Sequence, residues 1–99
     1  MPMQDLQTWV KNDWEQHSKQ QPSVELQLLY IMEELGEVAE AIRKTGGSKT
    51  RTQKDINLGA EFADLVISVV TLANHFNVNL DKEIADFKDR LAKRHSRGF

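Results

Sequence analysis

Residues 57–76 read NLGAEFADLVISVVTLANHF, a segment with the length of a helix and almost no polar face. At about 100° per residue, its apolar side chains cover most of the circumference, which predicts a helix that is buried nearly all round. Six polar side chains fall within one arc of about 80°, and they are Asn57, Glu61, Asp64, Ser68, Thr71 and His75. Burying an ionised carboxylate without compensation costs several kcal/mol. Glu61 and Asp64 must therefore face cationic side chains or a bound cation.

The preceding segment, from about residue 23 to residue 44, contains a second acidic pattern, IMEELGEVAE at 31–40. Its predicted core face is the arc formed by Leu28, Ile31, Met32, Leu35, Val38, Ala39 and Ile42. Glu34 lies at the edge of this arc, and Glu37 lies about 60° further round, also among apolar neighbours. Glu33 and Glu40 fall further round still, where we expect solvent. This helix therefore offers Glu61 and Asp64 only more carboxylates.

Two further amphipathic segments flank this central pair. Apolar periodicity and breaker residues predict four helices, at about 5–19, 23–44, 57–76 and 81–95. The expected N-caps are Asp5, Ser23 and Asp81. The polar stretch 46–56, which begins with two glycines, is expected to be a loop. Because no strand-like alternation or internal repeat is present, we expect one all-α domain over residues 1–99.

Composition excludes several classes of function. The formal net charge is -2, with 13 basic and 15 acidic residues, which argues against binding to a nucleic acid polymer. The chain has no cysteine, so disulfides and thiolate metal sites are excluded. The longest apolar-rich run, at 62–73, is short and carries a charge, so no membrane span is expected. We expect a soluble, cytoplasmic protein.

The inner carboxylates form two pairs, Glu34-x-x-Glu37 and Glu61-x-x-Asp64. Residues three apart share one face of a helix, so two antiparallel helices can bring all four carboxylates around one cavity. Such an all-oxygen set suits Mg²⁺, or Mn²⁺ in its place, and Mg²⁺ commonly keeps positions open for substrate phosphates. The alternative is ion pairing within a helix, but neither Glu61 nor Asp64 has a basic residue three or four positions later.

The stretches EELGEVAEAI (33–42) and EFADLVISVVTLANHFNVNL (61–80) resemble the MazG-type family of all-α nucleoside triphosphate pyrophosphohydrolases. The resemblance covers roughly residues 23–94. It implies metal ligation by Glu34, Glu37, Glu61 and Asp64. It also implies Mg²⁺-dependent hydrolysis of a nucleoside triphosphate to the monophosphate and pyrophosphate. Family members assemble as homodimers or homotetramers, so the two central helices are expected to form a bundle with a partner subunit.

Other residues are candidates for catalysis and substrate binding. A carboxylate that is not fully used as a ligand can act as general base, and Glu34 and Glu37 are both candidates. Family members commonly carry a lysine, an asparagine and a basic residue in the last helix. Lys88 and Arg94 can be matched to the two basic positions, although no asparagine follows, and the resemblance implies that they contact the substrate. The Trp14 indole could stack on a nucleobase or simply pack in the core. We expect His75 to form a hydrogen bond near a helix end.

Two other readings compete with hydrolysis. A carboxylate-bridged di-iron bundle needs Glu-x-x-His pairs, and the glutamates of the central helices are not followed by histidine at that spacing. A family member that has lost catalysis would act as a nucleotide-binding or interaction module. The retention of all four carboxylates argues against such a loss.

Overall fold

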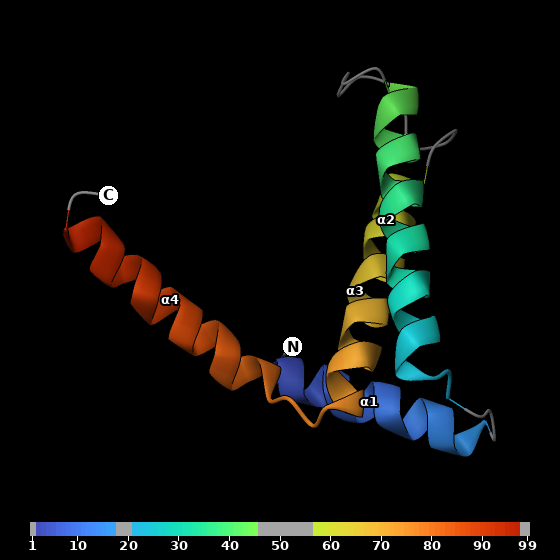
Figure 1. Ribbon diagram of the computed structural model, residues 1–99, viewed down its shortest axis with the longest axis horizontal. Helices are drawn as coiled ribbons and strands as arrows, with labels where there is room; N and C mark the ends of the chain where they lie inside the picture. The colour runs from blue at the N-terminus through green and yellow to red at the C-terminus, as the bar shows by residue number, and fades with distance from the viewer. Residues whose placement is uncertain (1, 18–20, 46–56, 98–99) are drawn as a thin grey trace.

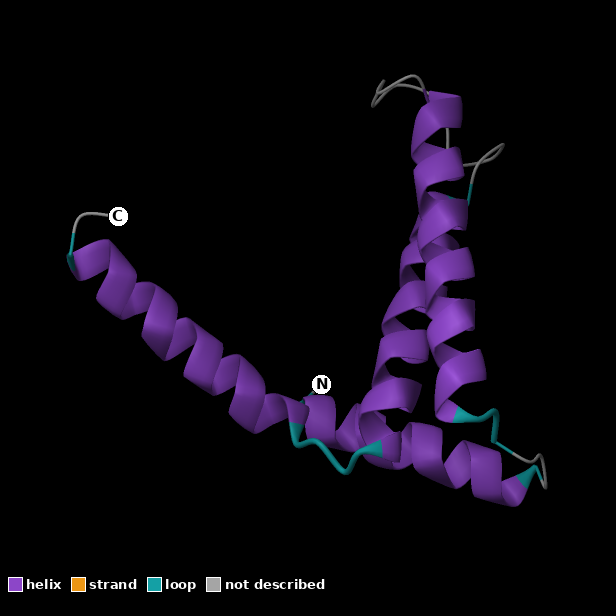
Figure 2. Cartoon of the chain, viewed as in Figure 1, coloured by secondary structure: helices purple, strands orange, loops and turns teal. Residues whose placement is uncertain are grey.

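The computed structural model describes residues 2–17, 21–45 and 57–97. These residues form four α-helices and no strand (Figure 2). The helices are α1 (Met3–Gln16), α2 (Val24–Thr45), α3 (Leu58–His75) and α4 (Leu80–Ser96). The predicted all-α class is confirmed, and the predicted helix ends agree to within three residues. The predicted loop at 46–56 lies outside the described residues.

Helices α2 and α3 run antiparallel side by side and form the most closely packed pair of the molecule (Figure 1). Helix α1 crosses one end of this pair and packs mainly on α3. Helix α4 packs on α1 and projects away from α2 and α3. The chain is therefore open in shape, with a helical pair at one side and a single protruding helix at the other.

The buried core is small, and α1, α2 and α3 contribute side chains to it. Its buried apolar side chains are Val10, Val38, Ala41 and Val70. Two polar side chains are buried with them, and both form hydrogen bonds. Gln27 Nε2 donates to the carbonyl of Ser68 at 3.0 Å, and Thr71 Oγ1 donates to the carbonyl of Ile67 at 2.8 Å. Their burial therefore leaves no unpaired side-chain donor, which limits its cost.

The predicted core faces of the central helices are wrong for the single chain. On α2, Met32 and Leu35 are 61% and 57% exposed, and Leu28 and Ile42 are also exposed. On α3, Phe62, Val66 and Val69 are exposed instead of buried. The physical reason is that α3 packs on the edge of the α2 arc, where Gln27, Val38 and Ala41 lie. The apolar arcs are wider than one neighbouring helix can cover.

Two of the three predicted N-caps are also wrong. Ser23 Oγ accepts from Leu26 N at 3.1 Å, as expected for a cap of α2. Helix α1, however, begins after Pro2, and Asp5 lies inside its first turn. Helix α4 is capped by Asn79, whose Oδ1 accepts from Lys82 N at 3.1 Å.

Asp81 instead caps a helix far away in the sequence. Its Oδ1 accepts from Met3 N and its Oδ2 from Gln4 N, both at 2.9 Å. These are N–H groups of the first turn of α1, which lack partners within their own helix. The carboxylate thus replaces the side-chain cap that Pro2 cannot supply.

Gln7 and Asn74 extend this contact into a network that we call the α1–α4 junction. Gln7 Nε2 donates to Val78 O at 2.7 Å and to Asn74 Oδ1 at 3.0 Å. Gln7 Oε1 accepts from Leu80 N at 3.1 Å, and Asn74 Nδ2 donates to the carbonyl of Gln7 at 3.0 Å. With the cap from Asp81, the junction ties α1 to the end of α3 and to the start of α4.

Replacing Asp81 by alanine should lower the free energy of unfolding by about 1 kcal/mol, the usual cost of a lost N-cap. Asp81→Asn should retain part of this, because the amide oxygen still accepts one hydrogen bond. Urea denaturation followed by circular dichroism measures the difference. Asp89→Ala is the matched control, since Asp89 forms a surface ion pair with exposed Lys93 on the same helix. Equal losses in both alanine variants would contradict the capping role.

Candidate metal centre

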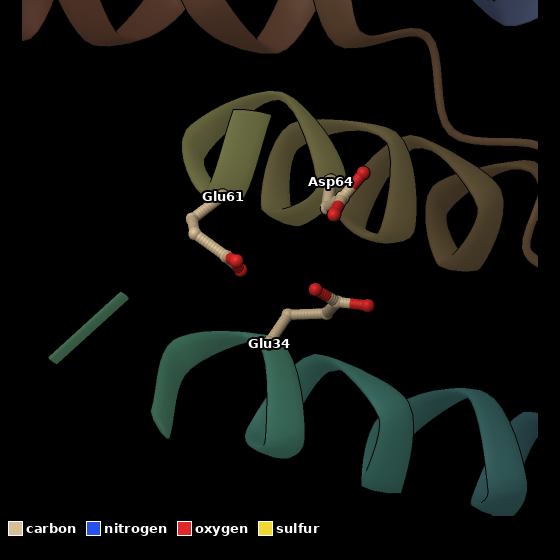
Figure 3. Close-up of side chains that lie close together, drawn as sticks. All are labelled: Glu34, Glu61 and Asp64. Carbon is tan, nitrogen blue, oxygen red and sulfur yellow. The ribbon is translucent and has the colours of Figure 1, made fainter. Parts of the chain in front are cut away.

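Three carboxylates meet where α2 and α3 face each other (Figure 3). Glu34 comes from α2, and Glu61 and Asp64 come from one face of α3. One oxygen atom of each lies within 4.8 Å of one oxygen of both others. The antiparallel packing of the two helices creates this arrangement, because it sets the i, i+3 pair of α3 opposite Glu34.

Within residues 2–17, 21–45 and 57–97, these carboxylates have no cationic side chain to compensate them. The atoms Glu34 Oε2 and Glu61 Oε2 are buried, and neither of these two atoms has a hydrogen-bond partner among the described residues. Asp64 is exposed. Among the residues that the structure describes, no lysine, arginine or histidine forms an ion pair with any of the three. Unpartnered, buried carboxylate oxygens from two helices are suitable ligands for a hard divalent cation.

The electrostatics of the cluster favour the same interpretation. Burial, followed by the negative charges of Glu37, Asp64 and Glu61, raises the pKa of Glu34. Burial also raises the pKa of Glu61, as do a hydrogen bond with Glu37 and the charges of Glu37 and Asp64. Both groups therefore resist ionisation when no cation is present. A divalent cation would reverse this preference, so its binding should release protons.

The four glutamates of the 31–40 stretch lie in different environments. Glu37 is exposed and is not one of the three clustered carboxylates. Its negative charge nevertheless raises the pKa of both Glu34 and Glu61. Glu40 pairs with Arg43 at 2.6 Å, and the hydrogen bond from Arg43 lowers the pKa of Glu40. Glu33 is exposed. The geometry thus brings Glu34 to the cluster, and ligation by Glu37 stays a prediction.

A cavity of about 260 Å³ lies beside the carboxylate cluster. Its wall includes Glu34 itself, the indoles of Trp9 and Trp14 from α1, and the phenol ring of Tyr30. We call it the aromatic pocket. Gln27 also lines this pocket, and the sequence interpretation had not selected it. The available signal was its position, because Gln27 precedes Glu34 by two helical turns and so shares its face.

The remaining candidate residues do not gather at the cluster. Lys88 and Arg94 are exposed on α4, the helix that projects away from α2 and α3. His75 Nε2 is buried without a hydrogen-bond partner in the described part of the chain, contrary to the hydrogen bond expected for this residue. Within this single chain, Lys88 and Arg94 are therefore not placed to contact a substrate at the carboxylate cluster.

The fold and the site together define an all-α protein with a cluster of three carboxylates between two antiparallel helices. The family of the MazG nucleotide pyrophosphohydrolase domain matches residues 22–99, so the chain belongs to this family. The chain is also 24% identical over 102 residues to the uncharacterized protein YvdC of Bacillus subtilis (strain 168). That similarity covers 95% of this chain and 96% of the relative. No solved structure matches the chain.

Within the described ranges, no helix is long and apolar enough to cross a membrane.

Proposed function

We propose that the protein hydrolyses a nucleoside triphosphate to the nucleoside monophosphate and pyrophosphate, with Mg²⁺ as cofactor and Mn²⁺ as a substitute. The observation that carries the proposal is the pair of buried, unpartnered oxygens of Glu34 and Glu61, which face each other beside Asp64. Membership of the MazG nucleotide pyrophosphohydrolase domain family supports the reaction class.

Glu34, Glu61 and Asp64 would hold the cation, with Glu37 as the fourth candidate ligand. When bound, Mg²⁺ neutralises negative charge that builds up on the triphosphate oxygens during bond cleavage. Glu37 is the better placed general base of the two candidates, because it is exposed and lies beside the cluster instead of within it. Its carboxylate would accept a proton from the attacking water. The water oxygen adds to phosphorus as the bond between the α- and β-phosphates breaks, and pyrophosphate leaves.

The experiment that tests this function is a substrate panel with Mg²⁺ that scores pyrophosphate against orthophosphate release. The panel contains standard and modified ribo- and deoxyribonucleoside triphosphates. Pyrophosphate as the product, with activity lost in EDTA and restored by Mg²⁺ or Mn²⁺, is expected. Release of orthophosphate alone would rule out cleavage between the α- and β-phosphates.

The aromatic pocket is the proposed site for the nucleobase. It opens beside Glu34, so a base held there would place its triphosphate near the carboxylates. Stacking of a base on an aromatic side chain contributes about 1–3 kcal/mol. Trp14 is half-buried in the pocket wall and offers an indole face for this contact.

Replacing Trp14 by alanine should raise KM about tenfold and leave kcat nearly unchanged, since stacking on the base is equal in the ground and transition states. Trp14→Phe keeps an aromatic face and should recover most of the affinity. Steady-state kinetics on the best substrate of the panel measures both variants. A fall in kcat with constant KM would place Trp14 at the reacting phosphates or in the fold instead of at the base.

We also propose that the protein functions as a homodimer or homotetramer. The exposed apolar arcs of α2 and α3 support this, because contiguous apolar surface of this kind marks an interface. Size-exclusion chromatography with light scattering measures the mass directly.

A further inference from the structure

Gln27 is a polar side chain in the wall of the aromatic pocket that is almost completely buried. It is 4% exposed, and its Nε2 donates to the carbonyl of Ser68 on α3 at 3.0 Å. Because a carbonyl can only accept, the nitrogen of the Gln27 amide must face α3, and its oxygen, Oε1, is left for the pocket. Oε1 accepts no hydrogen bond from the described residues, and it is not one of the fully enclosed atoms. Gln27 therefore holds a free acceptor in a fixed position.

Thr71 contributes a second acceptor to the same wall. It is also 4% exposed, and its Oγ1 donates to the carbonyl of Ile67 at 2.8 Å. A hydroxyl has one hydrogen, so Thr71 Oγ1 can only accept from a ligand. The two side chains are bonded to the carbonyls of successive residues, Ile67 and Ser68, and thus lie at the same turn of α3. The buried polar part of the pocket wall therefore presents two acceptors.

These acceptors set a requirement on a base that stacks in the pocket. A stacked base excludes water from the wall that it covers. A buried acceptor that loses water and gains no donor costs more free energy than an ordinary hydrogen bond contributes. A base is therefore bound well only if it brings N–H donors to the oxygens of Gln27 and Thr71.

The nucleobases differ in the donors that they can bring. Cytosine and adenine carry an exocyclic amino group, which has two N–H donors, where thymine and guanine carry a carbonyl oxygen. Uracil and hypoxanthine also carry a carbonyl oxygen there. That oxygen would face two acceptors and leave both unpaired. The neighbouring ring N–H of these bases supplies one donor, so one of the two acceptors still lacks a partner. The wall thus matches the amino group better than the carbonyl group.

We propose that the aromatic pocket selects the bases that carry this amino group, cytosine and adenine, and that Gln27 Oε1 and Thr71 Oγ1 accept its two hydrogens. This inference rests on the proposed pyrophosphohydrolase function, because it names the substrate class of the same site. It concerns one functional group at the edge of the base, so it applies to either ring size and to either sugar. Gln27 and Thr71 would contact the base and take no part in breaking the phosphate bond.

Matched pairs of substrates test the proposal. CTP and UTP differ at the amino or carbonyl position, as do ATP and ITP, while the sugar and the triphosphate are the same within each pair. For the ring size that is hydrolysed faster, kcat/KM for pyrophosphate release should be about tenfold or more higher with the amino member. Equal values within the pair, or a preference for the carbonyl member, would overturn the proposal.

Variants of the two acceptors assign the selection to these side chains. Gln27→Met removes the acceptor at similar length and should bring the ratio of the two kcat/KM values close to one. Thr71→Val should lower this ratio, and Thr71→Ser, which keeps the hydroxyl, should restore it. Both substrates are measured on the same preparation, so a variant that folds incompletely loses activity on both and keeps the ratio. A wild-type ratio in both Gln27→Met and Thr71→Val would refute the proposed roles.

Gln4→Met is the matched control for the exchange of glutamine by methionine. Gln4 is exposed on α1 and does not line the aromatic pocket. Its replacement should leave the ratio of the two kcat/KM values at the wild-type value. A change in this ratio equal to that of Gln27→Met would show that selection does not depend on the pocket wall.

Binding of nucleoside monophosphates separates this inference from the proposed function, since no bond is cleaved. Isothermal titration compares CMP with UMP and AMP with IMP. Both tryptophans of the chain line the pocket, so quenching of tryptophan fluorescence shows whether the nucleotide binds there.

The outcomes of the kinetic and binding experiments are distinguishable. If wild type releases no pyrophosphate but binds the amino monophosphate about tenfold more tightly, the proposed function fails and the base selection stands. Pyrophosphate release with equal affinities and equal rates within both pairs would refute the selection alone. A protein that neither releases pyrophosphate nor binds any of these nucleotides would refute both.

Discussion

Glu61→Gln should lower kcat for pyrophosphate release by about 10³-fold or more, the size of effect seen when one group that stabilises developing charge is removed. The amide preserves the shape of the side chain but removes its negative charge. Glu61 Oε2 is one of the two buried carboxylate oxygens that lack a hydrogen-bond partner among the described residues, so the amide replaces no hydrogen bond at this atom. Asp64→Asn should act in the same way.

Glu40→Gln is the matched control for both variants. Glu40 lies on α2 and is paired with Arg43 at the surface, so its loss should leave kcat at the wild-type value. Isothermal titration with Mg²⁺ should show weakened binding to the Glu61 and Asp64 variants alone. Full activity of Glu61→Gln would show that catalysis does not depend on the carboxylate cluster.

Glu34→Gln should change stability in opposite directions with and without metal. In metal-free buffer the native state raises the pKa of Glu34, so its ionised form is disfavoured by folding. This group therefore favours folding at low pH and loses that contribution as pH rises through its raised pKa. Because glutamine does not ionise, the variant lacks this pH-dependent contribution to the free energy of unfolding. Its melting temperature at pH 7 should exceed that of wild type, and its stability should vary less between pH 7 and the ordinary carboxyl range.

Saturating Mg²⁺ should reverse this order. Wild type gains about 2.7 kcal/mol at a metal concentration a hundred times its Kd, whereas the variant has lost a ligand and gains less. Differential scanning calorimetry in EDTA and in Mg²⁺ measures both effects. Glu33→Gln, at an exposed position of the same helix, should show neither. A wild-type protein whose melting temperature ignores Mg²⁺ would favour the alternative of an interaction module without a metal site.

Periodicity was sufficient to predict the four helices and to place Glu34, Glu61 and Asp64 on helix faces that meet. Glu34 and Glu61 lie on the sides of their helices that border apolar residues, whereas Glu33 and Glu40 lie on a side that faces solvent. The side follows from the position in the chain, because each residue advances about 100° round the helix. The polar stripe of the segment 57–76 could be recognised in the sequence because most other residues of this segment are apolar. These are local properties, and local properties are what a sequence shows most directly.

The errors concern contacts between distant parts of the chain. Periodicity shows that Leu35 and Val66 are on apolar faces, but it does not show which chain covers them. Asp81 has the residue type and position of a cap for its own helix, yet it binds the N–H groups of Met3 and Gln4. Gln27 is a single polar residue on a helix, and only the position of α3 shows that it lines the pocket.

The cap from Asp81 also determines when the first turn of α1 can be completed during synthesis of the chain. Chains leave the ribosome amino end first, so the residues of α1 are made before all the other helices. The first turn of α1 nevertheless receives its hydrogen-bond acceptor only after Asp81 has been translated. Helix α1 is therefore synthesised before α2, α3 and α4, but its first turn is completed only after the chain as far as Asp81 has left the ribosome.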